Sequence, residues 1–157
     1  RGSTGGAGMT AVTFQELIYA GLLRVSDGYR ARNSELGGDD GPIFLRGAYL
    51  QDDGFHVNDP DRFSQLPKAG FGDKIAKSGD TVITTKGNST GRVGYVNSNV
   101  EGAVYSPHLS YWRSLDHERI WPRFLHYWSK GSQFQNQLHG FAFQTDMAPY
   151  LGNPPRK

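Results

Sequence analysis

The loop that joins Lys86 to Arg92 carries the side chains best suited to chemistry in this sequence. Lys86 and Arg92 supply positive charge, while Asn88, Ser89 and Thr90 supply hydrogen-bond donors and acceptors. The glycines of the loop permit a close approach of the backbone to a ligand. This combination suits a phosphate backbone or the edges of bases better than it suits covalent catalysis.

Two apolar runs flank this loop and must hold it in place. Thr81 to Thr85 is rich in β-branched residues and follows a tight start at Gly79-Asp80, and Val93 to Val96 forms the second run. β-Branched residues separated by a polar, glycine-containing segment are typical of two paired strands. The sequence therefore predicts a strand–loop–strand unit over residues 79–96.

The same loop does not match a nucleotide-hydrolysing phosphate loop. That pattern, G-x-x-x-x-G-K-[ST], requires a lysine, a hydroxyl and a helix after the second glycine, whereas Arg92 is followed by strand-like residues. The sequence also lacks G-x-S-x-G and H-E-x-x-H, and its five histidines lack metal-ligand spacing. Asp39-Asp40 and Asp52-Asp53 adjoin glycine, which is typical of turns. We expect no catalytic residue, no metal and no cofactor on this chain.

Composition predicts one globular domain with many turns, because the chain has 157 residues and 21 of them are glycine. The absence of cysteine excludes disulfides and thiolate metal sites, and it agrees with the reducing cytoplasm that we expect for this protein. No apolar run reaches the roughly 20 residues of a membrane helix, and no signal peptide is visible. A formal charge of +2 permits nucleic-acid binding without requiring it. We expect residues 1–8 to be a tag or linker, 9–151 the domain, and 152–157 a disordered tail.

Three further segments supply polar or basic side chains that suit a nucleic acid. The first is a basic and aromatic loop that follows the turn at Asp27-Gly28. The second is the end of the predicted strand at 43–46, and the third is a polar loop near the C-terminus. The candidate residues in these segments are Tyr29, Arg30, Arg32, Asn33, Arg46, Gln144 and Thr145. Arginine and lysine can bind phosphates or guanine, and amide side chains can read adenine. A solvated surface loop is the alternative interpretation for each of them.

Short strands and a few short helices complete the chain. A capping box at Thr13–Glu16 predicts a helix over about 14–20, and a second at Ser132–Gln135 predicts a helix that ends at about 139. Pro122 predicts the start of a third helix. The third helix carries Trp121, Phe124, Leu125 and Trp128 at helical spacing, so we expect these side chains in the core.

The remaining predicted elements are strands at 22–26, 43–46, 103–105, 109–113 and 141–143, a hairpin at 50–57, and helical turns at 60–66 and 73–76. Pro107 is expected at a sheet edge or a bulge. This mixture predicts an α+β domain built on a twisted, mostly antiparallel sheet.

Several segments, taken in order, resemble the target recognition domain of type I restriction-modification specificity subunits. The similar segments are DGYRARNSELG at 27–37, IFLRG at 43–47, GDTV with TTKG and GRV over 79–93, YSP with WRSL over 105–115, PRFL with YW over 122–128, and QTDMA at 144–148. The resemblance covers residues 17 to 151. It rests on the order and spacing of the segments rather than on one motif.

The resemblance implies a reader of double-stranded DNA without catalytic residues, which recognises one half of a split site. It implies methyltransferase and restriction subunits as partners, with S-adenosylmethionine bound only to the methyltransferase subunit. The sequence lacks the long spacer helix of that family, so the chain is expected to be an excised domain or a stand-alone reader.

A protein-interaction domain is the alternative function. In that case the basic loops are merely solvated and an aromatic surface that includes Tyr19, Tyr111 or Tyr150 binds a partner.

Overall fold

The computed structural model describes residues 14–86 and 90–131. Two α-helices, eight strands and three short 3₁₀ helices form in this part of the chain. In chain order they are α1 (Phe14–Tyr19), β1 (Leu23–Asp27), η1 (Asn33–Glu35), β2 (Phe44–Leu45), η2 (Gly47–Tyr49), β3 (Leu50–Gln51), β4 (Gly54–Phe55), η3 (Gly72–Lys74), β5 (Thr81–Thr84), β6 (Val93–Tyr95), β7 (Val104–Tyr105), β8 (Leu109–Ser114) and α2 (Pro122–Ser129).

A four-stranded antiparallel sheet with the order β1-β8-β5-β6 forms the centre of the molecule. The two inner strands, β5 and β8, are buried along their whole length because both faces of the sheet are covered. β2 pairs with β7 in parallel, and β3 pairs with β4 as a hairpin. The predicted fold class, α+β with a mostly antiparallel sheet, is confirmed.

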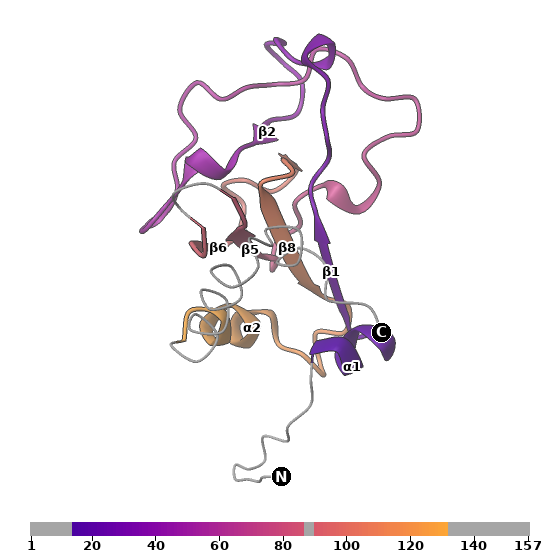
Figure 1. Cartoon of the computed structure of the whole chain (residues 1–157), viewed down its shortest axis with the longest axis vertical. Helices are drawn as coiled ribbons and strands as arrows, with labels where there is room; N and C mark the ends of the chain where they lie inside the picture. The colour runs from indigo at the N-terminus through magenta and orange to yellow at the C-terminus, as the bar shows by residue number, and fades with distance from the viewer. Residues whose placement is uncertain (1–13, 87–89, 132–157) are drawn as a thin grey trace, which may run out of the picture.

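The helices cover one face of this sheet. Alternation along the strands turns Leu23, Ile83 and Trp112 to that face, where they pack against Leu125 of α2. The ring of Phe14 in α1 lies edge-on to Trp112 and to Trp128, with both ring centroids 4.6 Å away. Both helices therefore lie at the lower end of the molecule in Figure 1.

The other face carries the second part of the core. Val82, Leu109 and Tyr111 point to this face and pack against β2, β7 and the segments around residues 76 and 96–103. A third cluster, made of Phe44, Phe63, Phe71 and Val104, lies beneath the long loops. These loops fill the upper part of the molecule in Figure 1.

Two predicted hairpins are confirmed and one predicted helical turn is wrong. β5–β6 and β3–β4 form where the sequence places them. Residues 60–66 form no helical turn, because Arg62 and Phe63 form bridges with Ile43 and Leu36 and a bend follows at Ser64 and Gln65. Pro107 lies in the turn between β7 and β8 rather than at a bulge.

The buried stripe of α2 is offset by one residue from the predicted stripe. Pro122, Leu125, His126 and Ser129 are buried at spacings of three, four and seven residues, so they face the sheet. Trp121 and Phe124 consequently point outward and are 61% and 45% exposed, which corrects their predicted place in the core. The prediction is right for Leu125 and Trp128, which pack in the core.

Several predicted elements lie outside the described residues. These are the Thr13 and Ser132 caps, the helix expected to reach residue 139 and the strand at 141–143. Among the helices of the described ranges, none is long and apolar enough to cross a membrane.

Candidate nucleic-acid interface

The two principal predicted binding loops leave the sheet at the same end. β1 ends where Asp27 lies opposite Ser110, and β5 ends where Thr84 lies opposite Leu109. Both strands run antiparallel to β8, so they point in one direction, toward the loops at the top of Figure 1. We call this end of the sheet the loop end. The segments after Asp27 and after Thr84 are therefore neighbours in space although they are far apart in sequence.

The turn between β7 and β8 lies between these two loops. Leu109 N donates to Ser106 O at 3.1 Å, which closes a β-turn with Pro107 at its second position. Tyr29 N donates to Tyr105 O at 2.7 Å on one side of the turn, and Thr85 N donates to His108 O at 2.9 Å on the other. The turn thus connects both loops to the sheet through backbone hydrogen bonds.

Gly28 allows the first loop to lie directly on this turn. A β-carbon at Gly28 would lie 2.1 Å from Ser106 O and 2.3 Å from Tyr105 O, both of them backbone atoms. No larger residue fits there without moving the backbone, so the glycine of the Asp27-Gly28 pair has a packing role.

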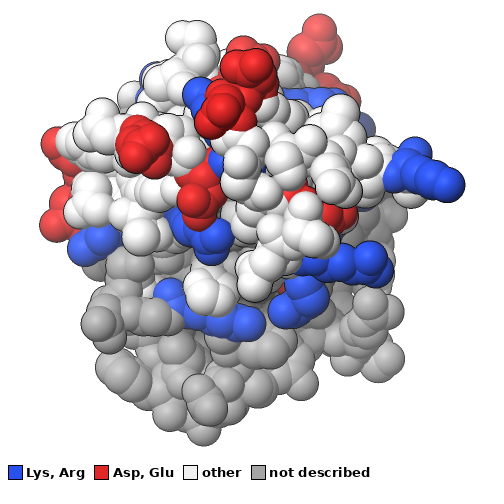
Figure 2. Space-filling model, turned by 90° about the horizontal axis from the view of Figure 1, so that it is seen from above, with Lys and Arg blue, Asp and Glu red and all other residues white. Residues whose placement is uncertain are grey.

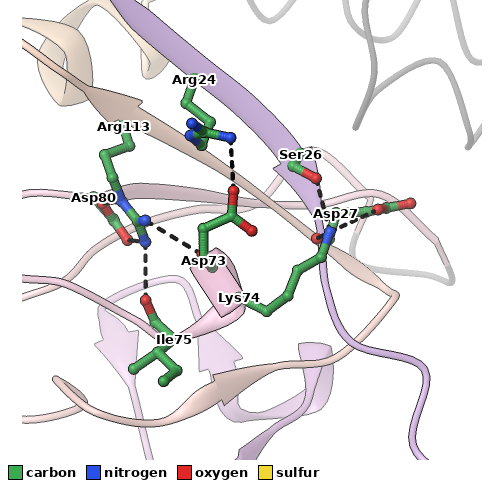
Figure 3. A network of polar contacts seen from close by, with 8 residues as sticks. All are labelled: Arg24, Ser26, Asp27, Asp73, Lys74, Ile75, Asp80 and Arg113. Atoms are coloured by element: carbon green, nitrogen blue, oxygen red, sulfur yellow. Dashed lines mark hydrogen bonds and ion pairs between the residues drawn. The ribbon is translucent and has the colours of Figure 1, made fainter. Parts of the chain in front are cut away.

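Lys74 in η3 fixes the base of the same loop (Figure 3). Its Nζ donates to Ser26 Oγ at 2.8 Å and to the carbonyl of Asp27 at 2.7 Å. Asp73, the residue before it, forms an ion pair with Arg24 at 2.7 Å. The end of β1 is therefore held from the side as well as by its pairing with β8.

A buried ion pair connects η3 and β8 to the start of β5. Arg113 donates Nε to Asp80 Oδ1 at 2.8 Å and Nη2 to Asp80 Oδ2 at 2.7 Å (Figure 3). The same guanidinium donates to the carbonyls of Ile75 and Asp73. Tyr105 Oη donates to Asp80 at 2.6 Å, and burial first, then the Asp80 charge, raises the pKa of Tyr105 well above its usual value.

Three predicted cations stand exposed on the loops. Arg30, Arg32 and Lys86 are exposed, and Asn33 is exposed at the start of η1. The Arg30 guanidinium and the Lys86 ammonium have no ion-pair partner in the described part of the chain. Thr90 is half-buried. These residues keep their candidate role in binding.

Tyr29 belongs to the third core cluster in the structure. Its ring lies edge-on to Phe71, with centroids 5.1 Å apart, and its hydroxyl donates to Glu35 at 2.9 Å. This hydrogen bond raises the pKa of Tyr29, and the amide of Arg32 followed by the Tyr29 hydroxyl lowers the pKa of Glu35. Tyr29 thus shapes the loop, and a contact with DNA by its ring stays a prediction.

Arg46 and Arg92 are engaged within the protein. Arg46 pairs with Asp61, and its guanidinium lies 4.9 Å from the centroid of the Phe44 ring. Arg92 donates to Leu50 O at 3.0 Å and pairs with Asp52 at 3.0 Å. These contacts give Arg92 a role in joining the β5–β6 hairpin to the β3–β4 hairpin.

Four candidate residues lie outside the described ranges, namely Asn88, Ser89, Gln144 and Thr145.

Figure 2 looks down on the loops from the top of Figure 1. Lys and Arg side chains gather along the lower part of the described surface in this view, whereas Asp and Glu gather toward its upper and left edges. The charge on this face is therefore unevenly distributed, with one side suited to an anionic partner.

No group of His, Asp and Glu in the described ranges could hold a metal ion. The predicted turns at Asp39-Asp40 and Asp52-Asp53 agree with the structure, which places all four residues in bends or turns on the surface.

Solved structures of type I restriction-modification proteins are among those similar to this chain. The type I restriction-modification S subunit from M. genitalium has a TM-score of 0.49 and 11% identity over 80% of this chain and 28% of its own. The HsdS subunit from Thermoanaerobacter tengcongensis has a TM-score of 0.46 and 13% identity over 87% and 38%. A structure of type I R-M complex assembly and conformational transition has a TM-score of 0.47 and 15% identity over 85% and 38%.

The chain spans only 28% to 38% of the length of these three solved chains. No protein-family model and no curated protein matches its sequence. Because these identities and TM-scores are low, a function for this chain must rest on its own segments and on the geometry of its loop end.

The sequence did not indicate the roles of three residues, namely His108 at the loop end and the pair Asp80 and Arg113 at the opposite end of the sheet. Asp80 and Arg113 lie 33 positions apart, and only the fold brings them together. His108 follows Pro107 in the short polar segment between two strand-like runs, and that position is the one signal by which it could have been found.

The aromatic side chains that the alternative hypothesis places on one surface differ in their exposure in the structure. Tyr19 is 71% exposed, but Tyr111 is completely buried against Tyr105 and Arg113, so its predicted place on a surface is wrong. Burial, the largest cause, raises the pKa of Tyr111 to about 12. Tyr150 lies outside the described residues.

Proposed function

We propose that this chain recognises double-stranded DNA through the loop end of its sheet, as the target recognition domain of a type I specificity subunit. The observation that carries this proposal is the common exit of the Tyr29–Asn33 loop and the Lys86 loop from one end of one sheet. Both segments resemble segments of that family. Reading one half of a split site is the specific role that follows from this resemblance.

The physical support is the exposure of Arg30, Arg32 and Lys86 on a fixed framework. Cations that neutralise phosphates release counterions, so affinity should fall steeply with salt concentration. Backbone hydrogen bonds and the Gly28 contact hold the first loop in place, which lowers the entropy lost when DNA binds.

A triple substitution tests the surface. Arg30→Ala, Arg32→Ala and Lys86→Ala together should abolish retention on a cognate duplex. The slope of log K against log salt should fall by about 0.9 for each phosphate that the variant no longer neutralises. The duplex comes from selection over randomised sequences with the unaltered chain.

A matched triple serves as the control. Lys77, Arg119 and Lys130 are exposed cations away from the loop end. Alanine at these three positions removes the same charge and should leave DNA binding nearly unchanged. Equal losses in the two triples would show that only bulk charge acts, and equal affinity of the unaltered chain for all duplexes would refute sequence recognition.

Assembly with methyltransferase and restriction subunits is part of the same proposal. This chain would supply specificity, and S-adenosylmethionine would bind to the methyltransferase subunit. Methylation or cleavage of DNA by the purified chain alone would contradict this division of roles.

A second candidate function, a protein contact, is favoured by two exposed aromatic side chains, one just before α2 and one within it. Trp121 and Tyr127 are 61% and 60% exposed, although large aromatic residues are usually buried. Alanine at both positions should weaken co-purification with the methyltransferase subunit of the same system while DNA binding persists. Unchanged co-purification would remove this candidate.

A further inference from the structure

His108 is exposed in the β7–β8 turn between the two loops, and hydrogen bonds hold the backbone of this turn. Its carbonyl accepts hydrogen bonds from Thr85 N at 2.9 Å and from Thr85 Oγ1 at 3.1 Å. Ser106, at the other end of the β-turn, donates its backbone N–H to Leu45 O at 3.0 Å. β2 and the segment after β5 therefore fix the backbone of this turn from two sides.

The imidazole itself is free to meet a ligand. His108 is exposed, and its ring has no hydrogen-bond or ion-pair partner within residues 14–86 and 90–131. Its β-carbon lies 3.7 Å from the place of a β-carbon at Gly47, so the Arg46–Gly47 segment lies directly beside it. A fixed backbone combined with an unpaired polar ring is the arrangement that a specific contact needs.

We propose that His108 is a specificity-determining residue, which contacts the edge of one base in the bound DNA. This inference rests on the proposed function. A neutral imidazole offers one donor and one acceptor, so it can distinguish base edges by their hydrogen-bond pattern. The cations of the neighbouring loops, Arg30, Arg32 and Lys86, carry the phosphate contacts that position the duplex.

The structure favours a base contact over a phosphate contact by His108. A phosphate can be reached by a long, flexible side chain such as that of Lys86. A base edge in a groove is better read by a short side chain on a fixed backbone, because few torsions must be ordered when its hydrogen bonds form. His108 has only two side-chain torsions and stands at the middle of the loop end.

Selection on randomised duplexes with the full chain tests this assignment. His108→Ala should relax the preference at a single base position by about 5- to 150-fold and leave the other positions unchanged. The salt slope should stay the same. His108→Gln, which keeps a donor and an acceptor, should alter the preferred base at that same position.

His117→Ala provides the matched control, because His117 is also exposed but lies in the connection after β8, away from the loop end. Its selected sequences should equal those of the unaltered chain. A uniform loss of affinity for His108→Ala with a salt slope smaller by about one would make His108 a phosphate contact and overturn the inference. A large fall in melting temperature for both His108 variants would make the side chain structural and overturn it as well.

Failure of the proposed function appears in a different measurement. If the unaltered chain selects no sequence, DNA reading itself is refuted. If it selects a sequence that the His108→Ala variant also selects at every position, only the role of His108 is refuted.

Discussion

Asp80 shows how one residue can hold several parts of this molecule together. Its carboxylate accepts hydrogen bonds from Arg113, from Tyr105 Oη and from the amide of Lys77 at 3.1 Å. All of these donors are satisfied at a site that is 1% exposed. A buried charge that is paired and hydrogen-bonded is tolerated, whereas a buried charge without its partner is costly.

Replacing Asp80 by Asn should therefore destabilise the fold strongly. The amide leaves the Arg113 charge buried without a counterion and turns a donor toward other donors, so we expect a loss of about 3–5 kcal/mol in the free energy of unfolding. Urea denaturation measures this loss. Asp73→Asn removes an exposed pair with Arg24 and should cost at most about 1 kcal/mol. Similar losses for the two variants would contradict the importance of the buried pair.

His126 makes stability depend on pH. It is 7% exposed, and burial first, then Lys130 and Arg123, lowers its pKa to about 4. The unfolded chain binds the proton near pH 6.5. Between these pH values the unfolded state holds more protons than the folded state. The contribution of neutral His126 to stability is therefore fully present above pH 6.5 and is lost as the pH falls toward 4.

The His126→Gln variant should lose this dependence. Between pH 7 and pH 4 the free energy of unfolding should decline in both proteins. The decline should be smaller in the variant, and the difference between the two declines should be roughly 2–3 kcal/mol. Denaturant titrations at several pH values measure the difference. His117→Gln, at an exposed position, should keep the pH profile of the unaltered chain. Identical profiles for all three proteins would show that His126 does not titrate in this range.

At the scale of elements, close contact between backbones determines where the first loop lies. The Gly28→Ala variant would place a methyl group 2.1 Å from Ser106 O, so the loop must move away from the β7–β8 turn. We expect a loss of about 1–3 kcal/mol or more in stability, together with weaker DNA binding.

Gly47→Ala is the matched control for that substitution. Its added carbon would lie 3.7 Å from the nearest atoms, an ordinary contact. Thermal unfolding should show little change for Gly47→Ala and a marked decrease for Gly28→Ala. A small effect at Gly28 would mean that the loop is not held by this contact.

The elements that the sequence predicted correctly are those specified by local patterns. β-Branched alternation and turn glycines were sufficient for the β5–β6 and β3–β4 hairpins. In α2 the same kind of pattern failed by one residue, because Trp121 lies before the first turn and Pro122 begins the buried stripe. Aromatic residues fit either side of such a short helix, so periodicity alone could not choose the face.

The contacts that decide the candidate interface are long-range, and local patterns do not contain them. Arg92 donates to the carbonyl of Leu50, 42 positions away, a contact within the protein that the sequence did not indicate, and its contact with DNA stays a prediction. The neighbourhood of His108, Gly47 and Thr84 likewise arises from strand order. Sequence could name the basic loops, but only the sheet shows which of their cations are exposed.

At the scale of the whole molecule, the distribution of free charge matters more than its sum. The net charge is only +2, and several cations are neutralised by carboxylates within the described residues. These ion pairs are Arg24–Asp73, Arg46–Asp61, Lys74–Asp27, Arg92–Asp52 and Arg113–Asp80. The cations that stay unpaired on the Tyr29–Asn33 and Lys86 loops therefore define the proposed DNA surface.

Hydrogen exchange can locate this surface without any substitution. A cognate duplex should slow amide exchange in residues 30–33 and at His108 at the loop end, because bound DNA excludes water and stabilises these segments. Residues 115–119, which connect β8 to α2 near the opposite end of the sheet, should exchange at an unchanged rate. A duplex of scrambled sequence at the same salt concentration controls for general charge effects. Protection confined to 115–119 and α2 would place DNA on the helices and contradict the orientation argued from the sheet.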